Sequence, residues 1–188
     1  GIQLNFKTKS LYTDLNLSLT SDFDSTQTFS ILPKHTAIHS AVKLQVNCPE
    51  EHQNQINKVL IYNKKKNYKS YIKPKVSGTI LSCNLKSFGD FGFSLDTIPP
   101  TLELPYLSKG KQAKTHTRIT IKAFDDKSGI KSYKATLDGK WIILYYDAKN
   151  RKMYHYFEHQ ADGKTHTLEV ELTDVCGNKN RIKRQFLR

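Results

Sequence analysis

The stretch Arg118–Phe124, RITIKAF, decides the fold class of this chain. Polar and apolar residues alternate along it, so Ile119, Ile121 and Ala123 share one side of an extended backbone. A period of two is typical of a strand with one face on a core, whereas a helix needs a period of about 3.6. The turn-forming sequence Asp125–Gly129 follows directly. The stretch therefore predicts a half-buried β-strand that ends in a turn.

The rest of the second half repeats this pattern. Further strands are expected at Thr101–Leu104, Ile130–Leu137, Lys140–Tyr146, Arg151–Phe157, Thr165–Thr173 and in a last segment that carries Ile182 and Phe186. Between two of them, Asp138-Gly139 predicts a two-residue hairpin turn, because a type I′ turn requires a positive φ at both central positions. The side chains expected to face inward from the strand before the last are His166, Leu168, Val170 and Leu172. About seven strands result, as in a constant-type immunoglobulin sandwich.

The first half shows the same features less clearly. Candidate strands are Leu15–Leu19, Ala41–Val46, Lys58–Tyr62, Tyr68–Lys73, Thr79–Leu85 and Gly89–Leu95. The stretch Ser21–Thr28 is interpreted as a loop. Neither half contains a convincing window of about ten residues with the apolar spacing of a helix.

The segment Asp96-Thr97-Ile98-Pro99-Pro100 lies between the two patterns. Two consecutive prolines fix φ and remove two backbone donors, so this segment cannot lie inside a sheet. It is interpreted as a short joint between domains; the alternative is a proline-bearing loop inside one larger domain. We therefore expect an all-β chain of two tandem immunoglobulin-like antiparallel β-sandwich domains, residues 1–97 and 98–188.

The chain of 188 residues carries a formal net charge of +13, and both halves contribute to the excess of Lys and Arg. Such a field attracts polyanions: nucleic acid, anionic glycans, lipid headgroups or teichoic-type polymers. The alternative is that Lys solvates exposed strand faces and protects sheet edges. Lys64, Lys65 and Lys66 occupy a predicted hairpin turn, where they would either meet an acidic polymer or form a solvated tip. No nucleic-acid-binding motif accompanies them, so a specific nucleic-acid partner is not expected.

Membrane and targeting segments are not apparent. No apolar run approaches the roughly 20 residues that span a bilayer, so no transmembrane segment is expected. No signal peptide is present either. The chain enters strand-like sequence almost at Gly1, which indicates a fragment of a longer protein.

The three cysteines, Cys48, Cys83 and Cys176, form no C-x-x-C pair. Zinc-ribbon and thioredoxin-like sites are therefore unsupported. A Cys48–Cys83 disulfide is one arrangement to test. Cys176 would then be a small buried hydrophobic residue.

Aromatic residues gather in two adjacent predicted strands. Exposed, they would form a face that stacks on sugars, with Trp141, Tyr145 and Tyr154 as the candidate binding residues. Alternation places about half of such side chains inward, however, and Trp141 is most simply the core anchor of a central strand. Both interpretations stay open.

Acidic residues gather at predicted turns. Asp96, Asp125, Asp126 and Asp174 would supply oxygen ligands for calcium, the single cofactor under consideration. The alternative is ordinary turn chemistry, in which Asp bonds the backbone of its own turn.

The joint and the segments after it resemble a known family. Residues 88–101, FGDFGFSLDTIPPT, are similar to a passage in the C-terminal region of secreted Bacteroidetes peptidases of the lysostaphin/LytM type. The likeness continues through residues 125–133, 137–141, 146–150, 163–168 and 173–178, and residues 11–15 resemble the start of the preceding module. It covers most of the chain. In such proteins a zinc peptidase domain precedes this region and cuts peptidoglycan cross-links.

The catalytic motifs of that family do not occur in this chain. The peptidase holds zinc with H-x-x-x-D and H-x-H, and neither is present. His155 and His159 are four residues apart, but they flank a predicted strand end and are not expected to share a metal. No G-x-S-x-G elbow and no Gly-rich phosphate loop is present. We therefore expect no catalytic residue and no enzymatic activity in this segment.

The resemblance implies a non-catalytic accessory role for this chain. It would position or target the peptidase domain of a cell-envelope, peptidoglycan-cutting enzyme encoded upstream in the same polypeptide. Peptidoglycan or another anionic envelope polymer would be its partner, at a periplasmic, outer-membrane-associated or extracellular location. The alternative is a free-standing adhesin-like module that binds a glycan or an anionic polymer.

Overall fold

The computed structural model describes residues 1–107, 117–158 and 162–188 of the chain. The chain divides into two compact units, Gly1–Asp96 and Thr97–Arg188. All strand pairs in the described ranges are antiparallel. The predicted all-β class is therefore confirmed.

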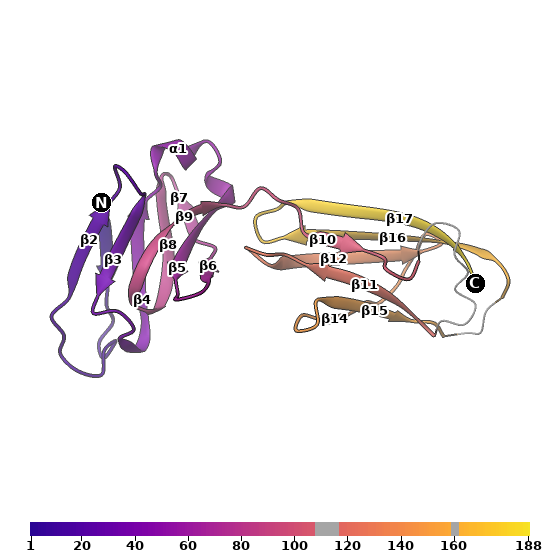
Figure 1. The fold of residues 1–188 in the computed structure, drawn as a ribbon, viewed down its shortest axis with the longest axis horizontal. Coiled ribbons are helices and arrows are strands. Elements are labelled where there is room, and N and C mark those ends of the chain that lie inside the picture. Colours follow the sequence, from indigo (N-terminus) through magenta and orange to yellow (C-terminus); the bar gives the residue numbers. More distant parts are fainter. Residues whose placement is uncertain (108–116, 159–161) are drawn as a thin grey trace. The chain divides into compact units, whose positions relative to one another are not determined.

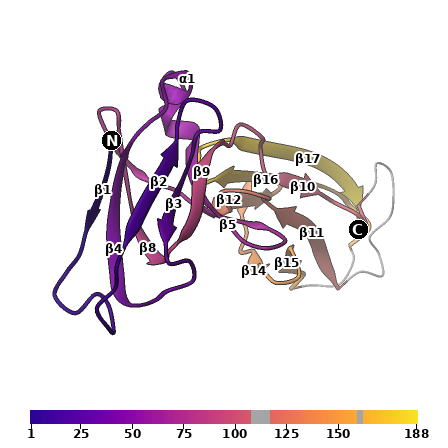
Figure 2. The ribbon, with the colours of Figure 1, turned by 60° about the vertical axis from the view of Figure 1, so that its left-hand side comes forward.

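The first unit is built from strands β1 to β9 in two sheets. The strands are β1 (Ile2–Asn5), β2 (Ser18–Asp22), β3 (Thr28–Leu32), β4 (Ala37–Asn47), β5 (Val59–Lys64), β6 (Lys69–Ile72), β7 (Lys75–Ser77), β8 (Ile80–Ser87) and β9 (Gly89–Leu95). One sheet has the order β1-β4-β8-β7 and the other β2-β3-β9-β5-β6 (Figure 2). Two short helical segments, α1 (Glu50–Gln53) and η1 (Ile56–Lys58), connect β4 to β5.

The core of the first unit lies between these two sheets. Its buried side chains alternate along the strands and include Phe29, Ile31, Val42, Leu44, Val46, Val59, Ile61, Leu81, Leu85, Phe91 and Phe93. Phe29 of β3 stacks on Phe91 of β9, with ring centroids 5.3 Å apart. This packing makes the unit a β-sandwich, because each sheet covers one face of a shared apolar layer.

Four strands of the first unit differ from the sequence prediction. Two of them, β1 and β7, lie where no strand was expected. The strand expected at Leu15–Leu19 lies at Ser18–Asp22 and is exposed along its whole length, so no alternation of burial indicates it. β3, which carries the core residues Phe29 and Ile31, was not expected at all. β3 is a short strand that directly follows a Ser- and Thr-rich stretch, and it pairs with β2 on one side and β9 on the other.

The second unit contains strands β10 to β17. They are β10 (Thr101–Glu103), β11 (Arg118–Phe124), β12 (Ile130–Leu137), β13 (Lys140–Trp141), β14 (Tyr145–Asp147), β15 (Lys152–Tyr156), β16 (Thr165–Asp174) and β17 (Lys179–Leu187). One sheet has the order β10-β11-β15-β14 and the other β13-β12-β16-β17 (Figure 1). The strand predicted at Arg118–Phe124 is confirmed, and Ile119, Ile121 and Ala123 are all buried.

The core of the second unit again lies between two sheets. Its buried side chains include Leu102, Ile119, Ile121, Ala123, Ala135, Leu144, Met153, Leu168, Val170, Leu172 and Phe186. The inward positions expected for Leu168, Val170 and Leu172 of β16 are therefore confirmed. The unit is a second β-sandwich, built on the same principle as the first.

The strand expected at Lys140–Tyr146 is divided in two. β13 pairs with β12, whereas β14 pairs with β15 of the other sheet. The chain crosses from one sheet to the other at residues 142–144, and Leu144 is buried on the way. The interpretation of Trp141 as a core anchor is wrong, because β13 is the edge strand and the Trp141 side chain is 70% exposed.

The hairpin turn that joins β12 to β13 has the predicted backbone. Asp138 has φ 52° and Gly139 has φ 77°, so both central positions are left-handed, as Asp-Gly favours. The turn also places the Asp138 carboxylate against β16, where Oδ1 accepts a hydrogen bond of 2.7 Å from the Thr167 amide.

The Cys48–Cys83 disulfide that was considered from the sequence is not formed in the structure. Both residues are free thiols. On the paired strands β4 and β8, Cys83 lies opposite Leu44, whereas the Cys48 amide bonds the Thr79 carbonyl. Four residues along a strand separate the two positions, roughly 13 Å. Burial raises the pKa of Cys83 to about 11, so it is no nucleophile at neutral pH.

The helical segments of the chain are short. Within the described ranges, none has the length and apolar character that crossing a bilayer requires.

Candidate functional site

A hollow of about 770 Å³ opens at the end of the second unit that carries the β12–β13 turn. It is lined by Leu137, Asp138, Lys140, Trp141, Ile142, Ile143, His155, Phe157, Glu158, Asp162, His166 and Arg188. We call it the Trp141 hollow. Its lining comes from both sheets and from the crossing segment between them, so the strand break after β13 creates it.

One side of the Trp141 hollow is apolar. Trp141 and Ile143 are 70% and 48% exposed, an unusual display of large apolar surface. The crossing segment that carries Ile143 is held by His155, whose Nδ1 lies 3.1 Å from the Ile143 carbonyl oxygen. His155 is buried and packs edge-on against Phe157. Contacts with buried His155 therefore hold the apolar side of the hollow on the core side, while Trp141 and Ile143 face solvent.

The other side is polar and centred on His166. Its Nδ1 lies 2.6 Å from Asp138 Oδ2, and its Nε2 lies 3.2 Å from Asp162 Oδ1. The hydrogen bond to Asp138 raises the pKa of His166; burial opposes this, and Asp162 adds to it. The ring also packs against buried Phe186, at a centroid distance of 5.9 Å. One imidazole ring thus links two carboxylates, one from the β12–β13 turn and one from the segment just before β16.

The two carboxylates are acceptors rather than acids. Burial works to raise the pKa of Asp138, but the bonds from the Thr167 amide and His166 lower it overall. The amide of Lys164, followed by His166, lowers the pKa of Asp162. A glycoside hydrolase needs one carboxyl with a raised pKa as its general acid. Because the pKa of both Asp138 and Asp162 is lowered, these two carboxylates are suited to accept hydrogen bonds from ligand hydroxyls.

Sequence reasoning did not identify these polar residues as a site. Asp138 was assigned to a turn, which the structure confirms, and His166 to the inward face of a strand, where it is only partly buried. Only the pairing of the β12–β13 turn with the start of β16 brings them together. An Asp-Gly turn facing a His on a paired strand is a signal visible only once strand register is known.

The structure separates the three aromatic residues that were expected to form one face. Trp141 lies on β13, whereas Tyr145 and Tyr154 face each other across β14 and β15 of the other sheet. The Arg118 guanidinium lies over the Tyr154 ring, 4.5 Å from its centroid. Because a cation already covers that ring, Tyr154 is a poor platform for a sugar.

The basic turn lies between β5 and β6 of the first unit. Lys64 and Lys66 are exposed, whereas Lys65 is partly buried and its Nζ donates a bond of 3.3 Å to Ser87 Oγ. The Lys65 amide also bonds the Tyr68 carbonyl and closes the turn. Contact of these lysines with an acidic polymer stays a prediction.

The predicted calcium ligands are distributed over both units. Asp96 is the buried last residue of the first unit, and Asp126 is exposed beside Arg151. Asp125 and Asp174 lie together in the second unit, with carboxylate oxygens within 4.8 Å. The calcium site stays a prediction.

Both of these neighbouring carboxylates also hold their own turns. Asp125 Oδ1 accepts bonds from the amides of Lys127 and Gly129, at 3.0 and 2.7 Å. Asp174 accepts bonds from the amide and the side chain of Asn178, at 2.8 and 2.7 Å. His159, which was considered together with His155 for a shared metal, lies outside the described residues.

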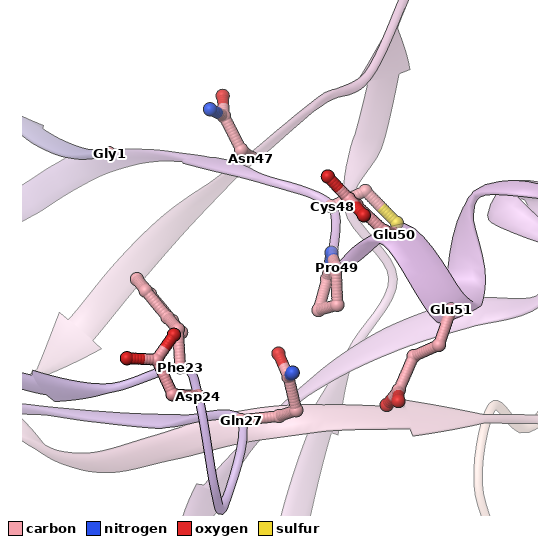
Figure 3. A pocket seen from close by; sticks show the side chains of 9 residues that line it. All are labelled: Gly1, Phe23, Asp24, Gln27, Asn47, Cys48, Pro49, Glu50 and Glu51. Carbon is pink, nitrogen blue, oxygen red and sulfur yellow. The ribbon is translucent and has the colours of Figure 1, made fainter.

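A second hollow, of about 620 Å³, lies in the first unit. Figure 3 shows Phe23, Asp24 and Gln27 on one side of it and the segment from Cys48 to Glu51 on the other. Its charged side chains are the carboxylates of Asp24, Glu50 and Glu51. Burial raises the pKa of the Cys48 thiol, so this hollow offers no activated nucleophile.

Comparison with known proteins gives a family for the first unit. The profile of the Zu5-like domain matches residues 1–96. A solved structure, an apo expansin from Clavibacter michiganensis, is 11% identical with a TM-score of 0.34, covering 77% of this chain and 75% of that one. No curated protein matches. Since the family match takes in just over half of the 188 residues, the chain belongs to the Zu5-like domain family.

Proposed function

We propose that this chain is a non-catalytic binding module whose second unit binds a glycan in the Trp141 hollow. The observation that carries the proposal is the 70% exposure of Trp141 at the edge of a hollow with a polar opposite side. An indole exposed to water offers a flat apolar surface, and the apolar face of a sugar ring packs on such a surface.

The opposite side of the hollow supplies the polar half of sugar recognition. Asp138 and Asp162 are acceptors for hydroxyl groups, and their geometry is set by His166 before any ligand arrives. Pre-organised acceptors bind without a further ordering cost. A ligand with hydroxyl groups around an apolar ring face fits both sides of the hollow.

The accessory role follows from the same binding. In this proposal both units are immunoglobulin-like sandwiches that carry a cell-envelope peptidase domain of the same polypeptide to its glycan. Two antiparallel sheets around one core in each unit support the immunoglobulin-like assignment. The accessory role is tested by the coding sequence: an upstream zinc peptidase domain with H-x-x-x-D and H-x-H supports it, and a gene without one favours the free-standing module.

The binding proposal is tested with the chain and its Trp141→Ala variant. Calorimetry with oligosaccharides and pull-down on peptidoglycan and lipopolysaccharide should show binding that the variant loses by at least about 10-fold, the effect of one lost aromatic contact. Tyr68→Ala is the matched control, because Tyr68 is an equally exposed aromatic residue of the first unit, at 66%. Equal binding by both variants, or no binding by the wild type, contradicts the proposal.

A further inference from the structure

The outer face of the sheet that carries Trp141 is strongly basic. Strand register places Trp141 opposite Thr136, Thr136 opposite Glu169, and Glu169 opposite Lys183. Directly paired residues of antiparallel strands point to the same side of a sheet. One transverse row therefore leads from the exposed indole on β13 to a lysine on β17, three strand spacings or roughly 14 Å away.

The next rows add further cations to this face. Lys134 lies opposite Glu171 and Glu171 opposite Arg181, while Thr173 lies opposite Lys179. We call the outward set Lys134, Lys179, Arg181 and Lys183 the basic face. Inward positions of the same strands carry core residues such as Val170, so the basic face is turned away from the core.

Two carboxylates organise these four cations. Glu169 pairs with both Arg181 and Lys183, the latter at 2.7 Å. Glu171 pairs with both Lys134 and Lys179, at 3.4 and 3.9 Å. The hydrogen bonds from Lys183 and Arg181 lower the pKa of Glu169, so it stays ionised. Four cations on two carboxylates leave an excess of positive charge.

Exposure shows which charge a ligand meets. The cationic side chains are 64–69% exposed, whereas those of Glu169 and Glu171 are 24% and 21% exposed. The carboxylates lie beneath the cations and hold them in place. A partner that approaches this sheet therefore meets ammonium and guanidinium groups on the same face as one indole.

We propose that the ligand of the Trp141 hollow is an acidic polysaccharide, whose anionic groups contact the basic face while one sugar packs on Trp141. This inference rests on the proposed function and adds the substrate class. A single-stranded nucleic acid fits less well, because such binding uses several aromatic platforms along the strand. Trp141 is the one aromatic residue among the outward positions of the described strands of this sheet.

The test compares two forms of one polymer, polygalacturonate and its neutral methyl ester, by calorimetry at low and high salt. The wild type should prefer the acid form, and added salt should remove the preference. Arg181→Gln/Lys183→Gln should weaken binding of the acid form by about 10-fold or more, the effect of losing two charge contacts. It should leave the ester unaffected. Lys134→Gln/Lys179→Gln is a second variant with the same expectation.

The matched control is Lys122→Gln/Lys152→Gln, which removes the same charge from the outer face of the other sheet. An equal loss with this control overturns the inference, since net charge alone would then explain binding. Equal affinity for both polymers overturns it as well and leaves the glycan proposal standing. Tighter binding of poly-dT than of polygalacturonate overturns it in favour of nucleic acid. If no sugar polymer binds at all, both proposals fail.

Discussion

The Nδ1 atom of His166 lies 2.6 Å from Oδ2 of Asp138, and this pair ties the β12–β13 turn to the start of β16. The turn exists because Asp138 and Gly139 adopt left-handed backbone angles. The pairing of β12 with β16 then places the Asp138 side chain beside the histidine. The Asp138–His166 contact on the polar side of the Trp141 hollow therefore depends both on the local turn and on the register between β12 and β16.

This pair makes the stability of the second unit pH-dependent. The pKa of His166 is raised in the folded chain, so its contribution is complete below the unfolded value of about 6.5 and is lost as pH rises through the folded pKa. The pKa of Asp138 is lowered in the folded chain, so the stability that its carboxylate contributes is lost as pH falls through that pKa. Wild type should exceed His166→Gln in unfolding free energy by about 1 kcal/mol near pH 6.

The measurement is thermal unfolding of both proteins over a pH series. A difference of about 1 kcal/mol corresponds to roughly 4–8 °C in a unit of this size. It should shrink toward zero in alkaline buffer. A difference that stays constant across the series would show that His166 stabilises by packing against Phe186 and not by its charge.

Two aromatic residues of the second unit should differ sharply in their effect on stability. Phe186 is 2% exposed inside the core, and Phe186→Ala should cost about 3–5 kcal/mol through the cavity it leaves. Trp141 is 70% exposed, and Trp141→Ala should change stability by no more than about 0.5 kcal/mol. Chemical denaturation measures both. A large loss with Trp141→Ala would restore the core-anchor interpretation.

The position of β11 in the second unit was predictable because burial alternates along that strand. β12 also matches its expected range, although residues 131–134 are all exposed and burial does not alternate along it. The expected strand at Lys140–Tyr146 was wrong because periodicity cannot show that a chain changes sheets midway. The position of β2 was predicted wrongly for another reason: all of its residues are exposed, so its sequence carries no burial pattern.

The candidate site was predictable only residue by residue. Trp141 was identified as a possible sugar platform from its residue type, but its exposure depends on β13 being an edge strand. The cations of the basic face are scattered along β12 and β17, far apart in sequence, and only their register with Glu169 and Glu171 gathers them. Neither fact is contained in local sequence.

Asp174 should stabilise the second unit by holding the turn that contains it, and not by binding a metal. It is fully buried and accepts two bonds from Asn178, so Asp174→Ala should cost about 1–3 kcal/mol. A turn role predicts the same loss in calcium and in EDTA. Unfolding in both buffers, with exposed Asp126→Ala as the control, measures this. A loss seen only in calcium would instead support the predicted metal site.

Gly92 of β9 should tolerate no side chain while Tyr62 lies across it. The two residues are direct partners of β5 and β9, and a Cβ atom on Gly92 would lie 2.6 Å from the Tyr62 Cζ atom. Gly92→Ala should therefore push the ring away from Lys69, whose Nζ lies 4.0 Å from the ring centroid, and cost about 1–3 kcal/mol.

In a Tyr62→Ala background the same change should cost less, because the clash is gone. A double-mutant cycle by chemical denaturation should give a coupling of about 0.5–3 kcal/mol between the two positions. Additive costs would show that the backbone of β9, and not the tyrosine ring, requires glycine at this position.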